Sequence, residues 1–201
     1  MKPMLVLGLM LMLPGCAALS ALQGEPARDV FELRPPEARS CRGGGGASLV
    51  VEPPKAGGAL NTNRIMIRPA ALQVQYLPDA TWSDPVPVML QTLLVRSLGE
   101  SNAFAHVGRE PLGVSGDYAL LSDLSDFNAA TGSGGTRVEA RLDAQIVDEM
   151  SASILSRRTF QVTTPAAGTG TAQLMAAFDT ATQQLVAEMS GWAIGAAGRC
   201  R

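Results

Sequence analysis

The chain has 201 residues, which is enough for one well-formed hydrophobic core and short for two. Its formal net charge is -2, from 16 basic and 18 acidic residues, which excludes the strongly basic surface of a nucleic-acid-binding protein and a polybasic membrane patch. One histidine and three cysteines are poor material for a metal site, so we expect neither a metal nor another cofactor.

The first part of the chain has the pattern of an export signal. Lys2 precedes ten apolar residues, Met4 to Leu13, which as a helix would rise about 15 Å, roughly half of a bilayer core. That length is typical of a signal peptide and not of a membrane span. The run ends in LPGC, which resembles the bacterial lipobox. We therefore expect residues 1–15 to be a signal peptide and Cys16 to carry fatty acyl (palmitate) chains; an ordinary cleaved signal peptide with an incidental cysteine is the alternative.

Acylation of Cys16 would hold the mature protein on a membrane, because two or more acyl chains anchor a protein stably. Ala17, and not aspartate, follows the cysteine, which in the sorting pattern of such lipoproteins favours the outer membrane, facing the periplasm. Residues 16–46 lack periodicity and contain two adjacent prolines and four consecutive glycines, so we expect a flexible tether, with room for one short extended piece at DVFELRP. The glycine run lacks the Lys-Ser/Thr ending of a phosphate-binding loop.

Two cysteines remain once Cys16 is acylated, Cys41 and Cys200. Thiols in the oxidising periplasm usually pair, so we expect a disulfide that joins the end of the chain to the segment before the first strand. Two free surface thiols, or pairing between chains, are the alternatives.

Residues 47–201 are expected to form one folded domain. Its first half predicts short strands at ASLVVEPP, NRIMIRP and ALQVQYLP, the last with alternating apolar and polar residues. A helix follows, for which Ser83 or Asp84 suits the N-cap, Pro85 the first turn and Gly99 the end. FAHV predicts a further short strand. The apolar residues at helical spacing that should face the core are Val86, Leu90, Leu93, Leu94 and Leu98.

The second half predicts three strands and a long helix. GDYALLSDLSDFNAA, TRVEARLDAQIVDEM and SASILSRRTFQVTTP should form an antiparallel meander, with a turn at TGSGG. The middle strand alternates apolar and polar residues, which indicates one buried and one solvated face. Residues 170–197 carry apolar residues at helical spacing. The whole predicts an α+β fold: a single domain with a mostly antiparallel or mixed sheet and two long amphipathic helices packed on one face.

No set of residues indicates catalysis, and we expect the protein not to be an enzyme. The single histidine, His106, lies beside apolar residues and is better explained as part of a strand. Asp123 and Asp126 are three residues apart, and a regular strand points such positions to opposite faces, so they are not expected to form an acid–base pair. Arg157 and Arg158 could bind an anion, but on a strand one of them points to water. The motifs of serine hydrolases, phosphate loops and zinc sites are missing.

Several short pieces stand in a characteristic order: LPGC, FELRPP, LVVEPPKAGGALNTNRIMIR, VQYLPDATWSDPVPVMLQTLLVRSLGESNAF and SDLSDF, followed by the C-terminal amphipathic stretch. In this order they resemble the ABC-type transport auxiliary lipoproteins (PqiC-like), which are associated with MCE-domain lipid carriers. The match covers most of the mature chain. Asn61 stands where the family often has aspartate, and the second half matches in pattern more than in residues.

The resemblance implies a non-enzymatic accessory of a lipid-transport system between the inner and outer membranes. Its partners would be an MCE-domain protein that spans the periplasm and an inner-membrane ABC permease and ATPase. The resemblance also makes self-assembly into a homo-oligomer plausible. A periplasmic lipid- or small-ligand-binding lipoprotein, with an apolar pocket between helices and sheet, and a purely structural envelope scaffold are the alternatives.

Trp82 and Tyr76 are the candidates for a partner interface. Tryptophan in a loop before a helix suits an interface anchor, because this residue is common at binding hot spots. The other interpretation, which we favour, is that Trp82 packs on the sheet and fixes the start of the helix. The same two interpretations apply to Tyr76.

Overall fold

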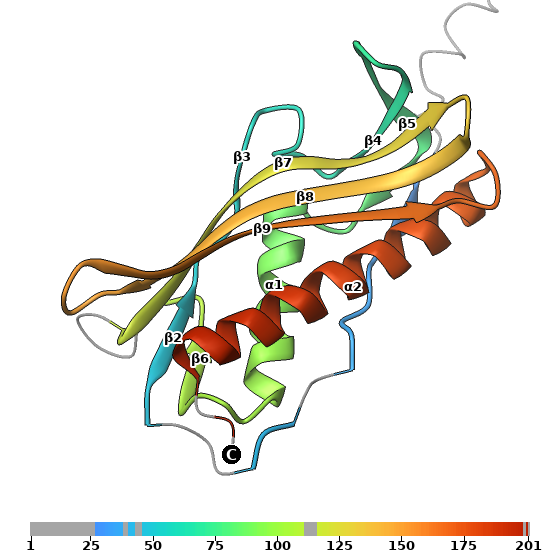
Figure 1. The fold of residues 1–201 in the computed structure, drawn as a ribbon. Helices are drawn as coiled ribbons and strands as arrows, with labels where there is room; N and C mark the ends of the chain where they lie inside the picture. Colours follow the sequence, from blue (N-terminus) through green and yellow to red (C-terminus); the bar gives the residue numbers. More distant parts are fainter. Residues whose placement is uncertain (1–26, 38–39, 43–45, 111–115, 199, 201) are drawn as a thin grey trace, which may run out of the picture.

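The computed structural model describes residues 27–37, 40–42, 46–110, 116–198 and 200 (Figure 1). The expected signal peptide and Cys16 lie outside these residues. No helix of the described part is long and apolar enough to cross a membrane. The elements are β1 (Asp29–Phe31), β2 (Ser48–Val51), β3 (Lys55–Ala56), β4 (Arg64–Ala70), β5 (Gln73–Trp82), α1 (Val86–Glu100), β6 (His106–Gly108), β7 (Tyr118–Gly132), β8 (Gly135–Asp148), β9 (Ser153–Pro165) and α2 (Thr171–Ala197).

The nine described strands form one mixed sheet. Strands β7, β8 and β9 are antiparallel and form the meander that the sequence predicts. Strands β2, β3 and β4 each pair with β7 in parallel, at different points along its length. The long strand β7 therefore joins the short strands of the first half to the meander of the second half.

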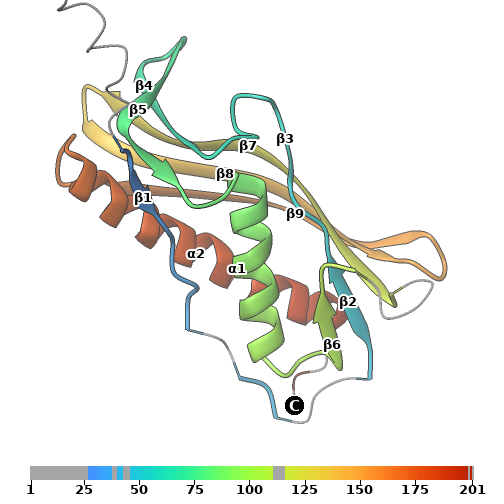
Figure 2. The ribbon, with the colours of Figure 1, turned by 180° about the vertical axis from the view of Figure 1, so that it is seen from behind.

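Both helices lie on one side of the sheet, with α2 along β8 and β9 and α1 beside α2 (Figures 1 and 2). The alternation in β8 matches this arrangement, since every second residue is buried towards the helices and the residues between them face outward. The α+β fold with two helices on one face is therefore confirmed. The buried residues of β8 are Val138, Ala140, Leu142, Ala144 and Ile146.

Helix α1 begins and ends differently from the prediction. Pro85 occupies the N-cap position, and no side chain caps the helix, so neither Ser83 nor Asp84 has the expected role. The first free N–H group, that of Val86, donates instead to the carbonyl oxygen of Thr62 at 3.1 Å. A tertiary contact thus replaces the local cap. Gly99 lies inside the last turn, and the helix continues to Glu100.

The expected tether of residues 16–46 is too long, because part of it belongs to the folded domain. Strand β1, which falls within the short extended piece expected at DVFELRP, pairs with β5 in parallel, and Leu33 and Cys41 are each 5% exposed. The segment is also held to α2, since the backbone N–H of Arg34 donates to the carboxylate of Asp179 at 3.1 Å. The Arg34 guanidinium donates to the same carboxylate, and this hydrogen bond raises the pKa of Arg34. Three strand residues and isolated buried side chains leave no periodicity from which to predict this packing.

A β-bulge in β7 changes the faces to which Asp123 and Asp126 point. The pairing of β7 with β8 skips Ser125, so the alternation shifts by one residue at that point. Leu124 and Phe127 consequently both face the core, and both carboxylates face the outer side of the sheet. The expectation of opposite faces was wrong, because it assumed a regular strand.

Strand β2 is tied at its start to the residue before β7. The Asp117 carboxylate accepts hydrogen bonds from the backbone N–H of Ser48 at 2.6 Å and from its hydroxyl at 2.8 Å. In return the Asp117 N–H donates to the Ser48 hydroxyl oxygen at 3.0 Å. The backbone hydrogen bond, followed by the hydroxyl, lowers the pKa of Asp117 below its ordinary value of 3.8.

We expect this contact to make stability depend on pH in the acid range. Because the pKa of Asp117 is lower in the folded than in the unfolded chain, its contribution is complete above 3.8 and is lost as pH falls through the folded value. The free energy of unfolding of Asp117→Ala should therefore approach that of the wild type between about pH 4 and pH 2. Urea titrations at several pH values measure this. A difference that stays constant down to about pH 2 would contradict it, and Ser48→Ala, which keeps the carboxylate, should show a smaller effect.

Candidate functional surfaces

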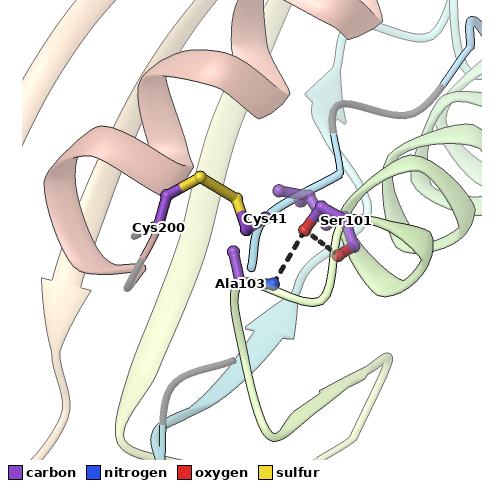
Figure 3. The surroundings of a disulfide bond; sticks show 5 residues. Cys41, Ser101, Ala103 and Cys200 are labelled. Carbon is purple, nitrogen blue, oxygen red and sulfur yellow. Dashed lines mark hydrogen bonds between the residues drawn. A yellow bond between two sulfur atoms is a disulfide. The ribbon is translucent and has the colours of Figure 1, made fainter. Parts of the chain in front are cut away.

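The structure brings Cys41 and Cys200 together in a disulfide, with their Cα atoms 4.8 Å apart although the two residues are 159 positions apart in sequence (Figure 3). The backbone N–H of Cys41 donates to the carbonyl oxygen of Ser101 at 2.8 Å. The Ser101 hydroxyl donates to the Leu98 carbonyl at 2.6 Å and accepts from the Ala103 N–H at 3.2 Å. The bridge therefore gathers the N-terminal segment, the end of α1 and the end of the chain at one place.

Trp82 is a core residue and not an exposed interface anchor. Only 1% of its surface is exposed. Its ring centroid lies 5.2 Å from that of Phe178 on α2 and 6.1 Å from that of Phe127 on β7. The partner interpretation of Trp82 is thus wrong. The packing interpretation holds, with the side chain in the middle of the core, where it joins β5, β7 and α2.

Tyr76 is half-buried at the base of the β4–β5 hairpin. Its hydroxyl donates to the carbonyl oxygen of Ala59 at 3.1 Å, and the Arg64 guanidinium carbon lies 4.0 Å from its ring centroid. This is a cation–π contact. Tyr76 therefore braces the loop between β3 and β4 against the hairpin.

The face of the sheet opposite the helices is polar. Two ion pairs lie on it: Arg137 Nε is 2.6 Å from Glu139 Oε1 along β8, and Arg68 Nη2 of β4 is 3.9 Å from Asp126 Oδ1 of β7. These four side chains line an open hollow of about 460 Å³. A mixture of both charges on neighbouring strands gives this face no strong preference for an anion or a cation.

The arginines considered as an anion site, Arg157 and Arg158, line a second open hollow of about 490 Å³. Asp123 and Asp143 line it too, so a bound anion would meet two carboxylates. The guanidinium carbon of Arg158 also lies 5.0 Å from the ring centroid of Phe160, on the same strand. The pair is better explained as a solvated part of β9.

His106 lies half-buried in β6, where it pairs with Ser48 of β2, which confirms the short strand predicted there. Among the described residues, no group of three or more His, Cys, Asp or Glu side chains is placed to hold a metal ion. A small apolar pocket of about 70 Å³ lies between the sheet and the start of α2, with Ile67, Leu77 and Leu174 in its lining.

Large exposed apolar side chains gather at two hairpin tips. Leu72 and Val74 lie on the β4–β5 hairpin, and Met150, Ile154 and Leu155 lie at the β8–β9 hairpin. Sequence reasoning missed both surfaces. The alternation that includes Leu72 and Val74 is typical of a half-buried strand, but the hairpin projects from the sheet, so both of its faces meet solvent (Figure 1).

The two tips lie at opposite ends of the sheet. Strand β4 runs parallel to β7 and reaches it at Ala129 and Ala130, near the end of β7. The β8–β9 tip lies beside the start of β7, where Tyr118 pairs with Asp148. About eleven strand residues, or roughly 36 Å, separate these two levels.

The chain is similar to a known protein family and to individual bacterial proteins. The family model described as "ABC-type transport auxiliary lipoprotein component" matches residues 31–190. An uncharacterised protein of Bradyrhizobium diazoefficiens is 32% identical over 181 residues, which is 85% of this chain and 46% of that protein. The chain therefore spans about half the length of that relative.

Solved structures share the fold. Protein XCC0632 of Xanthomonas campestris is 27% identical with a TM-score of 0.72, over 83% of this chain and 95% of that chain. The hypothetical protein CT253 of Chlamydia trachomatis is 8% identical with a TM-score of 0.53, over 76% of this chain and 98% of that chain, which is a likeness of fold alone. Because the family model matches most of the folded domain, the chain belongs to the ABC-type transport auxiliary lipoprotein family.

Proposed function

We propose that this protein is a non-enzymatic accessory of a lipid-transport system between the inner and outer membranes. In this proposal acylated Cys16 anchors it to the outer membrane, and the folded domain faces the periplasm. There it binds an MCE-domain protein that is coupled to an inner-membrane ABC permease and ATPase. The observation that carries the proposal is the family match, since that family comprises auxiliary lipoproteins of ABC-type transport and is not a class of enzymes.

The compartment is supported by the disulfide. A bond between Cys41 and Cys200 persists in an oxidising environment such as the periplasm and is rare in the cytosol. The lipobox-like LPGC sequence also indicates export across the inner membrane, to the periplasmic side.

Binding of a protein partner is better supported than storage of a lipid inside the domain. Ligand sites for small molecules usually have volumes of about 300–1,000 Å³ and apolar walls. The apolar pocket beneath α2 measures about 70 Å³, which is too small for an acyl chain. The hollows of about 460 and 490 Å³ have an adequate volume, but charged side chains line them and they open to solvent. A hollow of about 410 Å³ between the end of β9 and the start of α2 has a mainly apolar, uncharged lining, but it is an open surface groove that would leave an acyl chain in contact with water.

Within this proposal the partner binds at the β8–β9 tip. Met150, Ile154 and Leu155 are exposed there, with Met150 at 81%. Methionine is enriched in protein interfaces, and exposed apolar side chains that gather at one place often mark them. The tip also lies at the end of the sheet away from the β4–β5 hairpin, beside which β1 enters the domain (Figure 2). An anchor that precedes β1 would leave the β8–β9 tip free to reach into the periplasm.

A pull-down of full-length, acylated protein with a tagged MCE-domain protein from the same organism tests the proposal. We expect recovery with the wild type and a loss of more than about tenfold for Met150→Ser/Ile154→Ser/Leu155→Ser, because three apolar contacts are removed. The matched control is Leu72→Ser/Val74→Ser, which changes the other tip and should bind like the wild type.

The outcomes separate two parts of the proposal. Failure to recover any MCE-domain protein with the wild type would count against the transport partnership itself. Recovery that is the same for the triple variant and the wild type would overturn only the assignment of the β8–β9 tip.

A further inference from the structure

The tip of the β4–β5 hairpin is exposed and uncharged. No charged residue occurs between Arg68 and Asp79, and residues 69–75 are all exposed. Leu72 stands at the apex with its side chain fully exposed. Two-residue hairpin loops normally carry Asn, Asp or Gly, so turn chemistry does not explain an Ala-Leu pair at this place. A leucine held fully in water at the end of a projecting hairpin suggests that an apolar medium covers it.

The entry of the chain into the domain lies on the same side as this tip. Strand β1 runs parallel to β5, with Asp29 beside Ala80 and Phe31 beside Trp82. The chain that precedes β1 therefore comes from the direction of the start of β5, which is the hairpin tip. Figure 2 shows β1 beside β5, below the projecting hairpin.

The length of chain before β1 is sufficient for acylated Cys16 and the β4–β5 tip to contact the same membrane. Pro78, near the entry, is six positions from Leu72 along the chain, which is about 20 Å of extended strand. Eleven peptide units join Cys16 to Ala27, and they span at most about 40 Å. An acylated Cys16 can therefore lie in a bilayer while the tip touches its surface.

The other apolar tip is less suited to a bilayer. Asp148 and Glu149 directly precede Met150 at the β8–β9 tip, and carboxylates are repelled by anionic lipids and are costly to bury in a membrane interface. The β4–β5 tip carries no charge that would have to be desolvated. Chemistry and position thus both favour a lipid surface at the β4–β5 tip.

We propose that the β4–β5 tip, with Leu72 at its apex, inserts into the interface of the same bilayer that holds the acyl chains of Cys16. The contact rests on the lipid anchor of the proposed function and not on its MCE partner. It would restrict the rotation of the domain on its tether and direct the β8–β9 tip away from the membrane.

A fluorescent reporter at position 72 tests this contact. Leu72→Cys is labelled with the environment-sensitive dye NBD in full-length, acylated protein whose Cys41–Cys200 disulfide is intact. The protein is reconstituted into vesicles of phosphatidylethanolamine and phosphatidylglycerol that contain a lipid with a nitroxide on its acyl chain. We expect a shift of the emission to the blue and at least about twofold quenching by the nitroxide lipid, because the label enters the acyl boundary.

Met150→Cys, labelled in the same way, is the matched control, because this side chain is also exposed and lies at the other tip. Its emission should be the same with and without the nitroxide lipid. Circular dichroism and the melting temperature of both variants check that the fold is unchanged.

Three results would overturn the inference. The first is protein that floats with the vesicles but shows no quenching at position 72. The second is equal quenching at position 150. The third is a blue shift at position 72 without vesicles, which would indicate a second copy of the chain as the occupant. If the wild type is not labelled by fatty acid, the proposed lipid anchor is wrong, and so is the tip contact that depends on it. A failed MCE pull-down would contradict only the transport partnership and would leave the quenching result valid.

Discussion

Removal of the disulfide should lower the free energy of unfolding by about 4 to 5 kcal/mol. The bridge closes a loop of 159 positions, nearly the whole folded domain. In the chain-entropy model, a loop of this length restricts the unfolded chain by about 5 kcal/mol, which is the upper end of the measured range for native bridges. The variant to measure is Cys41→Ala/Cys200→Ala, since a single substitution would leave a reactive thiol.

Urea unfolding of this double variant and of the wild type, each with and without dithiothreitol, measures the effect. The wild type should become as unstable as the variant when it is reduced, and the variant should not respond to the reductant. Intact mass should increase by about 2 Da on reduction of the wild type alone. A loss below about 1 kcal/mol, or a wild type that is insensitive to the reductant, would contradict the expectation.

Trp82→Ala should lower the free energy of unfolding by about 3 to 5 kcal/mol. The side chain fills the space between β5, β7 and α2, and its removal leaves a cavity that the surrounding strands cannot close. The aromatic contacts with Phe127 and Phe178 are lost as well. Chemical unfolding monitored by circular dichroism measures this, because the substitution removes one of the two tryptophans.

Trp192→Ala is the matched control. Trp192 is half-buried on α2, where its ring lies 5.5 Å from Phe160 and its Nε1–H donates to the hydroxyl of Ser156 at 3.0 Å. Since its side chain already meets solvent, the loss should be smaller, about 1 to 2 kcal/mol. Equal losses for the two variants would contradict the core position of Trp82. Loss of partner binding by Trp82→Ala at unchanged stability would restore its role as an interface residue.

The parts of the fold that the sequence predicted are long and periodic. Strand β8 alternates over fourteen residues, and α2 repeats its apolar positions over 27. Such patterns arise because one face of each element is buried along its whole length. The pairing of β7, β8 and β9 follows from the short turns between them, because strands joined by short turns usually pair with their neighbours in sequence as an antiparallel meander.

The wrong predictions concern places where a tertiary contact or an irregular pairing, and not the local rule, decides the local structure. The start of α1 is satisfied by the carbonyl of Thr62, so the capping residues next to it are not used. One unpaired residue, Ser125, reverses the alternation of β7. The sequence carries this signal, since Leu124 stands at an even position and the next large apolar residue, Phe127, at an odd one, but the prediction for the two aspartates assumed a regular strand. Trp82 is not among these errors, because the favoured interpretation, packing on the sheet beside the helix start, is confirmed by its burial against α2.

By itself, the sequence determined the class of the fold, the meander of three strands and the family resemblance. The placing of its three cysteines was also enough to infer the compartment. Those features depend on local periodicity, on short motifs and on composition, which are readable along the chain. The tertiary structure alone decided that residues 29–41 pack on the domain, because their partners Asp179 and Ser101 lie far away in sequence. It also decided that the apolar tips at Leu72 and Met150 are exposed at opposite ends, since exposure depends on what lies beside a strand and not on the residues within it.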